Sequence, residues 1–190
     1  MHASLCDMIT DLVQNSIEAE AKEITLNVEE HKKELEITIR DNGKGMSAET
    51  LEKAKDPFWS DGKHRKRKVG LGLPFLYQTA EATGGSATVH SKEKIGTTVV
   101  FRAKADHVDL PQFGNFISAA TSLMTYGFKG NLMIERVRNG KSYTISKEEL
   151  TEVLGDLNDL TNLILLKQFI TSQEDDLNNV QNERYETWPK

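Results

Sequence analysis

The sequence has very little cysteine: Cys6 is the only one among 190 residues, so no disulfide can form within the chain. It also lacks any apolar run near the ~18 residues that a membrane-spanning helix needs. The first residues contain no basic region followed by an apolar stretch, so no secretory signal is predicted. A lone cysteine without a disulfide framework is typical of the cytoplasm, and we expect the protein there.

Basic residues are not in excess, because the formal net charge is −5. An acidic chain is not expected to bind nucleic acid in general. Hydrophobic residues make up 37% of the chain and charged residues 28%, a composition that fits one globular domain with a small appended unit.

An alternating stretch, Leu35 to Arg40, ends in the sequence Asp41-Asn42-Gly43-Lys44-Gly45-Met46. The alternation of apolar and polar residues has a period of two and predicts a half-buried strand. Asp41 is therefore an acceptor at a strand end, and Gly43 and Gly45 permit a sharp turn or the close approach of a ligand. Taken alone, this pattern is also typical of an ordinary turn.

Residues 3–19 have apolar side chains at helical spacing, which predicts a helix. Asp11, Asn15 and Glu18 follow one another at i, i+4 and i+7, so they share a neighbouring face of that helix. Either this face is solvated, or it places Asp11 and Asn15 in a site. The helix alone does not decide between the two interpretations.

A run of basic residues and histidine, Lys63 to Lys68, precedes Gly70-Leu71-Gly72 and a predicted helix that begins near Leu73. Self-repulsion makes such a run a loop unless an anion binds it. Backbone N–H groups and the helix dipole make a glycine-opened helix N-terminus an anion site. The alternatives are a solvated loop and a nucleic-acid patch. Beside the two glycines, the run fits a polyphosphate better than a nucleic-acid backbone.

The remaining elements of this region follow from alternation and capping. They are strands over 23–28, 86–90 and 96–102, and helices over 48–55 and 73–82.

In this order, the motifs resemble the GHKL ATP-binding superfamily of gyrase-type ATPases, the large heat-shock chaperone, histidine kinases and mismatch-repair clamps. The nearest likeness is to the histidine-kinase catalytic domain. Asp56 to Asp61 is similar to its phenylalanine box, and Val69–Leu73 with Glu81–Gly85 is similar to its second glycine box and following helix. The resemblance covers residues 3–104 and implies an α+β fold, a two-layer α/β sandwich of the GHKL type.

The resemblance implies that the chain binds ATP together with Mg²⁺. Asp41 would accept the adenine amino hydrogen, in part through a water shared with Thr97, and Asn15 would ligate Mg²⁺ through its side-chain oxygen. Glycine N–H groups and basic side chains would hold the phosphates: Gly70, Gly72, Lys63, Lys66, Arg67 and Lys68. The adenine wall, next to Gly43 and Gly45, would be formed by Met46, Phe58, Leu71 and Leu73.

Two features depart from the family. Its hydrolytic members have Glu four residues before the Asn as the base that activates water, and this chain has the shorter Asp11 there. Fast hydrolysis is therefore not expected, although Asp11 can act through a bridging water or orient Asn15. A histidine kinase also needs a phosphoacceptor hairpin before the ATP domain, and too few residues precede Asn15 to form one. Kinase activity would therefore act on another protein.

The ATP-binding domain is expected to end at residue 104, and residues 105–172 to form a small α/β extension. Its predicted elements are helices over 114–126, 147–154 and 161–171 and a hairpin at Asn139-Gly140. Residues 173–190 are acidic and amide-rich, and we expect a disordered tail there. The apolar stripes of the extension either pack in the fold or form a partner surface.

Three functions that use Mg–ATP remain open. The first is regulatory phosphorylation of an unidentified protein partner in trans. The second is a non-enzymatic switch, in which ATP controls partner binding, and the third is a slow ATPase clamp. No membrane or nucleic-acid partner is expected.

Overall fold

The structure is a computed structural model that describes residues 4–54 and 72–179. Its strands are β1 (Glu23–His31), β2 (Glu34–Asp41), β3 (Ser86–Lys92), β4 (Gly96–Lys104), β5 (Asn131–Arg138) and β6 (Lys141–Ser146). Its helices are α1 (Leu5–Glu18), α2 (Ala48–Ala54), α3 (Gly72–Ala82), α4 (Phe116–Thr125), α5 (Lys147–Leu154) and α6 (Leu160–Asn178). None of these helices combines the length and the apolar composition that a membrane span requires.

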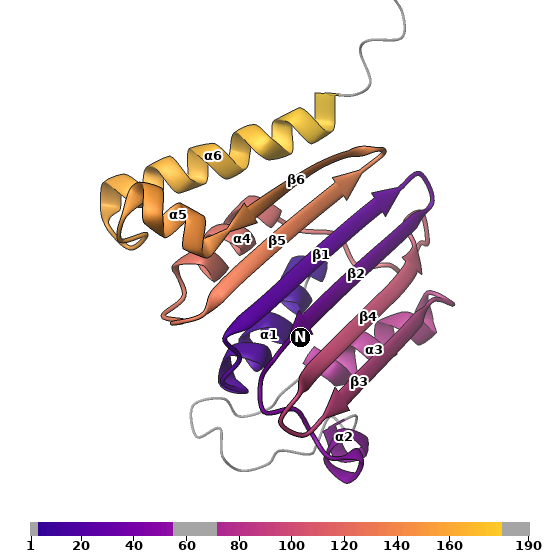
Figure 1. Cartoon of the computed structure of the whole chain (residues 1–190). Helices are drawn as coiled ribbons and strands as arrows, with labels where there is room; N and C mark the ends of the chain where they lie inside the picture. The colour runs from indigo at the N-terminus through magenta and orange to yellow at the C-terminus, as the bar shows by residue number, and fades with distance from the viewer. Residues whose placement is uncertain (1–3, 55–71, 180–190) are drawn as a thin grey trace, which may run out of the picture.

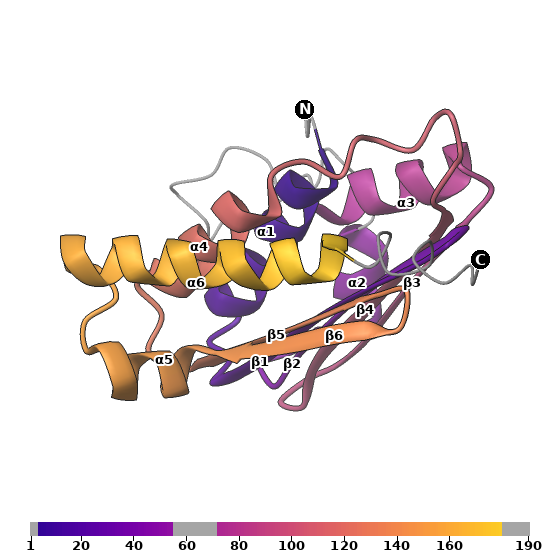
Figure 2. The same ribbon diagram turned by 90° about the horizontal axis from the view of Figure 1, so that it is seen from above.

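The strands form a single six-stranded sheet in the order β3-β4-β2-β1-β5-β6 (Figure 1). β1 and β5 are parallel, and every other neighbouring pair is antiparallel. Seen along the sheet, α1, α3, α4 and α6 lie on the same side of it (Figure 2). The predicted two-layer α/β fold is confirmed.

The alternation in β2 explains why the helices cover only one face. Leu35, Ile37 and Ile39 are almost completely buried, whereas the residues between them are partly exposed on the other face. Opposite them, α1 buries Ile9 and Val13 at 0% exposure. This shared core fixes α1 across the strand that ends at Asp41.

The start of α1 is held by the chain that follows β4. The N–H groups of Leu5 and Cys6 donate to the carbonyl oxygens of Gln112 and Phe113, each at 2.9 Å. These donors have no partner inside the helix, so the contact satisfies groups that a helix start otherwise leaves open. The segment after β4 therefore also positions α1.

The extension is continuous with the part of the sheet formed by β1 to β4. β5 pairs with β1 from Glu23↔Asn131 to Glu30↔Arg138, and the β5–β6 hairpin completes that edge. The predicted hairpin at Asn139-Gly140 is present. The apolar stripe of α4 packs in the same core as α1, with Phe116 and Leu123 buried.

The last helix differs from the sequence prediction, because α6 continues to Asn178 where a disordered tail was expected from residue 173. Glu174 is buried and accepts from Nε and Nη2 of Arg136 at 3.0 and 3.3 Å, and from the hydroxyl of Tyr143 at 2.6 Å. Leu177 is buried as well. The acidic composition concealed this buried pair, which anchors the last turns of α6. The tail beyond residue 179 lies outside the described residues.

Candidate functional site

Asp41 occupies the end of β2, opposite Thr97 of β4. Asp41 is 9% exposed, and its carboxylate accepts three hydrogen bonds. Oδ1 accepts from the N–H groups of Gly43 at 2.8 Å and Thr97 at 3.2 Å, and Oδ2 accepts from the hydroxyl of Ser16 at 2.8 Å. These donors come from β4, from α1 and from the turn after β2. They fix the position of both carboxylate oxygens.

The turn after Asp41 is packed tightly against its neighbours. Gly45 has a φ of +62°, and a Cβ built on it would overlap the carbonyl oxygen of Lys92. A Cβ on Gly43 would lie 2.7 Å from the carbonyl oxygen of Ala19. Close backbone contacts thus require both glycines, and their role in the approach of a ligand stays a prediction.

Met46 and Thr97 are joined through Ser91 of β3. The N–H of Met46 donates to Ser91 Oγ at 2.8 Å, and Ser91 Oγ lies 2.9 Å from Thr97 Oγ1. The structure therefore gathers Met46 and Thr97, both predicted to surround the adenine, beside Asp41.

A second group forms where α1 meets the first residue of α3. A Cβ built on Gly72 would lie 3.0 Å from Oδ2 of Asp11 and 3.4 Å from Nδ2 of Asn15. Asp11 and Asn15 are partly exposed on α1, and Leu73 packs against the core one residue further along α3. The helix face predicted from the spacing of Asp11 and Asn15 therefore meets a helix N-terminus, where backbone N–H groups attract anions.

The other predicted site residues lie outside the described part of the chain. They are Phe58, Lys63, Lys66, Arg67, Lys68, Gly70 and Leu71. Their roles as adenine and phosphate contacts stay predictions. Among the described residues, no group of three or more His, Cys, Asp or Glu side chains is placed to hold a metal ion.

Sequence reasoning missed Ser16 and Asn42. Ser16 is 4% exposed and lies on the buried stripe of α1 with Leu12 and Val13, so a polar residue on an apolar stripe was the available signal. Asn42 Oδ1 accepts from the N–H groups of Lys22 and Glu23 at 2.8 and 2.9 Å. Asn42, the residue that follows Asp41, thus connects the end of β2 to the loop between α1 and β1.

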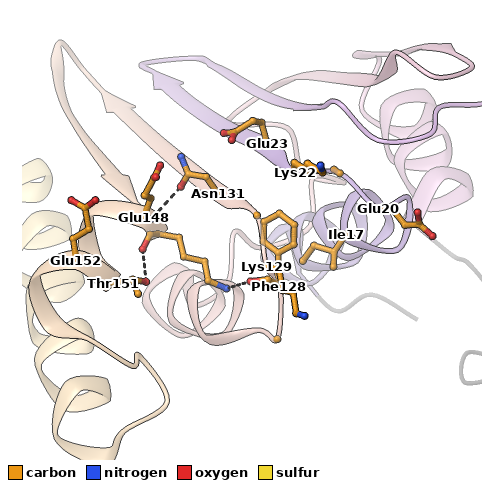
Figure 3. Close-up of a pocket in the computed structure, with 14 residues that line it drawn as sticks. Ile17, Glu20, Lys22, Glu23, Phe128, Lys129, Asn131, Glu148, Thr151 and Glu152 are labelled. Atoms are coloured by element: carbon orange, nitrogen blue, oxygen red, sulfur yellow. Dashed lines mark hydrogen bonds between the residues drawn. The ribbon is translucent and has the colours of Figure 1, made fainter.

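The same loop forms one wall of an open hollow of about 1190 Å³ (Figure 3). The other walls are the loop before β5, with Phe128 and Lys129, and the start of α5, with Glu148 and Glu152. Lys147 donates to the carbonyl oxygens of Tyr126 and Phe128 at this place, and burial lowers its pKa. The hollow does not include Asp41, Asn15 or Gly72, so it is separate from the site described above.

Residues 2–107 match the family described as "Histidine kinase-, DNA gyrase B-, and HSP90-like ATPase". The chain belongs to this family. Its histidine-kinase-like ATPase domain is an ATP-binding domain, in agreement with the resemblance drawn from the motifs.

Curated relatives of this ATPase domain include two histidine kinases. Histidine protein kinase DivJ of Caulobacter vibrioides is 31% identical over 103 residues, which are 52% of this chain and 17% of DivJ. Sensor histidine kinase WalK of Bacillus subtilis is 32% identical over 100 residues, 51% of this chain and 16% of WalK. The chain thus spans less than a fifth of the length of either relative. Among solved structures, the catalytic domain of histidine kinase ThkA aligns with a TM-score of 0.41 and 24% identity, covering 51% of this chain and 63% of that one.

Proposed function

We propose that this chain binds Mg–ATP and passes the γ-phosphoryl group to a partner protein, in a regulatory, signalling role in the cytoplasm. The observation that carries the proposal is the placement of two groups on α1. Ser16 holds the carboxylate of Asp41, and Asp11 and Asn15 meet the N-terminus of α3. Helix α1 thus contacts both the fixed acceptor, Asp41, and the N-terminus of α3, which is suited to an anion.

Asp41 is suited to the adenine amino group. A carboxylate has about four lone-pair sites, and three of them receive the internal donors, which leaves an acceptor for one more N–H. A ligand that offers only an acceptor there would gain nothing. This arrangement favours adenine, whose amino group donates.

The residues at α3 suit Mg²⁺ that arrives with the nucleotide. The side chains of Asn15 and Asp11 both reach the first residue of α3, and an amide oxygen and a carboxylate are hard donors of the kind that Mg²⁺ takes alongside phosphate oxygens and water. Bound there, Mg²⁺ would neutralise charge on the phosphates. Asn15 would hold the ion, and Asp11 would orient Asn15 or a water.

Transfer is favoured over hydrolysis because Asp11 has one methylene less than a glutamate base and so reaches less far towards a water. In the transfer step, the bond between the γ-phosphorus and its bridging oxygen breaks while a bond to a partner His nitrogen or Ser oxygen forms. The electron pair leaves with ADP, and the acceptor's proton is lost to solvent.

The test is incubation of the full chain, Mg²⁺ and ATP labelled at the γ-phosphate with proteins encoded beside its gene. We expect label on one of those proteins and little free phosphate. Asp41→Asn should abolish the labelling. Rapid release of free phosphate, or no labelled protein from a chain that binds ATP, would contradict phosphotransfer.

A second candidate is a non-enzymatic switch, which a hydrogen-bonded connection favours. Asn42 holds the loop at Lys22, and the N–H of Asn131 donates to the carbonyl oxygen of Lys22 at 2.8 Å. Asn131 Oδ1 in turn accepts from the Ser146 hydroxyl and the N–H of Glu148 at the start of α5. A nucleotide bound at Asp41 would thereby change the conformation of the extension at the start of α5. A partner affinity that differs between ATP and ADP without turnover would support the switch over the kinase.

A further inference from the structure

The first half of α6 is apolar on two sides. On its inner side, Leu166 and Ile170 are fully buried in the core. On its outer side, Leu160, Ile164, Leu165 and Phe169 are exposed by 73, 51, 45 and 41%. A helix that is hydrophobic all round is normally buried all round. Within residues 4–54 and 72–179, only the inner side of α6 is covered.

Helix α6 lies on the other half of the sheet from Asp41. α6 lies along the β6 side of the molecule, and β3, at the other edge of the sheet, is the strand farthest from β6 (Figures 1 and 2). Asp41 and Thr97 belong to β2 and β4, on the β3 half of the sheet. A protein bound to the outer side of α6 would therefore leave the nucleotide site free.

The pattern of residues 160–169 indicates what covers that side. They read Leu-Thr-Asn-Leu-Ile-Leu-Leu-Lys-Gln-Phe, and the order of apolar and polar residues is the same in both directions from the midpoint between Ile164 and Leu165. A two-fold axis at this midpoint would place Leu160 at the level of Phe169 in an antiparallel second helix, and Thr161 at the level of Gln168. On the outer side, the apolar levels 160/169 and 164/165 would then each meet an apolar level, and the exposed Thr161 would meet Gln168, as a self-complementary contact requires. Leu166 faces the core and takes no part in the contact.

The charges agree with this symmetry. Lys167 is the only charged residue from 160 to 173, and the same axis places it at the level of Asn162 rather than of a second lysine. The acidic residues Asp175 and Asp176 fall outside the overlapping levels 160–169. The outer side therefore has no array of charge that requires an oppositely charged partner.

We propose that the outer side of α6 binds a second copy of this chain, as an antiparallel helix pair with a two-fold axis between Ile164 and Leu165. Ile164 and Leu165 meet their own counterparts at the centre, and Leu160 and Phe169 close the two ends. The overlap is only about 15 Å long at 1.5 Å per residue, so the dimer dissociates reversibly on dilution.

Sedimentation equilibrium of the full chain over roughly 1 to 200 μM tests the proposal, because the average mass should rise towards that of a dimer across this range. Leu165→Asp and Phe169→Asp each put a carboxylate in the contact, and each should weaken dimerisation by at least ~10-fold. Val108→Asp is the matched control, since Val108 is 91% exposed and lies after β4, off α6. Circular dichroism melts verify that all three variants fold.

Cross-linking tests the register. Cys6 is buried, so Ile164→Cys supplies one reactive thiol per chain, and a short bismaleimide should join two chains covalently. Val108→Cys should give no such product. A chain that is monomeric at every concentration overturns the proposal, even if α6 then binds a different protein. So does a dimer that Leu165→Asp and Phe169→Asp leave unchanged, or equal cross-linking at Val108.

Discussion

The hydroxyl of Ser16 donates a 2.8 Å hydrogen bond to Oδ2 of Asp41, and so joins the last turn of α1 to the end of β2. Both side chains are buried, at 4 and 9% exposure. Asn15, the preceding residue, is turned towards the first residue of α3. A small rotation of α1 would therefore disturb both ends of the proposed nucleotide site together.

Replacement of Ser16 by Ala should lower ATP affinity by about 10-fold, because a hydrogen bond to a carboxylate contributes about 1.5 kcal/mol or more. Isothermal titration with Mg–ATP measures this. Thr10→Ala is the control, since among the described residues the Thr10 hydroxyl bonds only to the Cys6 carbonyl oxygen of the same helix. Equal affinities of Ser16→Ala and Thr10→Ala would remove Ser16 from the site.

Replacement of Asp41 by Asn should lower ATP affinity by about 100-fold. The new NH₂ group must face either the donors from Ser16, Gly43 and Thr97 or the adenine amino group, and each orientation sets donor against donor. The titration is repeated on Asp106→Asn, which changes an exposed carboxylate. If Asp41→Asn binds ATP as the parent does, the pocket assignment is wrong.

Replacement of Asn15 by Ala should remove most of the effect of Mg²⁺ on ATP affinity, while affinity without the metal stays unchanged. The reason is that the amide oxygen is the predicted ligand beside the phosphates. Titrations with Mg²⁺ and with a chelator measure the difference, and Gln14→Ala on the same helix is the control. An unchanged metal requirement in Asn15→Ala would contradict its role.

Replacement of Glu174 by Gln should lower the free energy of unfolding by about 2 kcal/mol, because the guanidinium of Arg136, only 1% exposed, loses one of its two counter-charges among the described residues and keeps Glu30, whose Oε1 lies 2.7 Å from Nη2. Arg136 also lies 4.5 Å from the ring centre of Phe116, so it cannot turn out to water without disturbing the core. Urea unfolding measures the loss. Glu36→Gln breaks an exposed pair with Arg102 and should cost far less. Equal costs would show that burial does not strengthen the pair.

Stability at high pH should depend on Cys6. Burial raises the pKa of this thiol from 9.0 to about 12. Between these values the unfolded chain has lost the proton and the folded chain keeps it, so folding becomes less favourable as pH rises, by up to about 1.4 kcal/mol per pH unit. Cys6→Ala removes this contribution, and urea unfolding at several pH values above 9 should show a shallower fall than in the parent. If the free energy of unfolding falls equally with pH in the parent and in Cys6→Ala, the thiol is not buried as described.

The elements of the ATP-binding part could be predicted from the sequence because their signals are local. The alternation before Asp41 and the stripe of α1 each lie within one element. The bond between Ser16 and Asp41 joins residues 25 positions apart, and no local pattern encodes such a contact. Helix α6 was cut short for the same reason, since the partner of Glu174 is Arg136, 38 positions away.

The parallel pairing of β1 with β5 also bears on how the chain is made. β1 is complete at residue 31, but its second neighbour is delivered only when residue 138 has been synthesised. Until then a nascent chain presents the backbone groups of β1 to any other extended strand, the situation in which edge-to-edge aggregation begins. A fragment ending at residue 107 would keep that bare edge permanently, so the residues proposed to recognise nucleotide rely on the later half of the chain for their solubility.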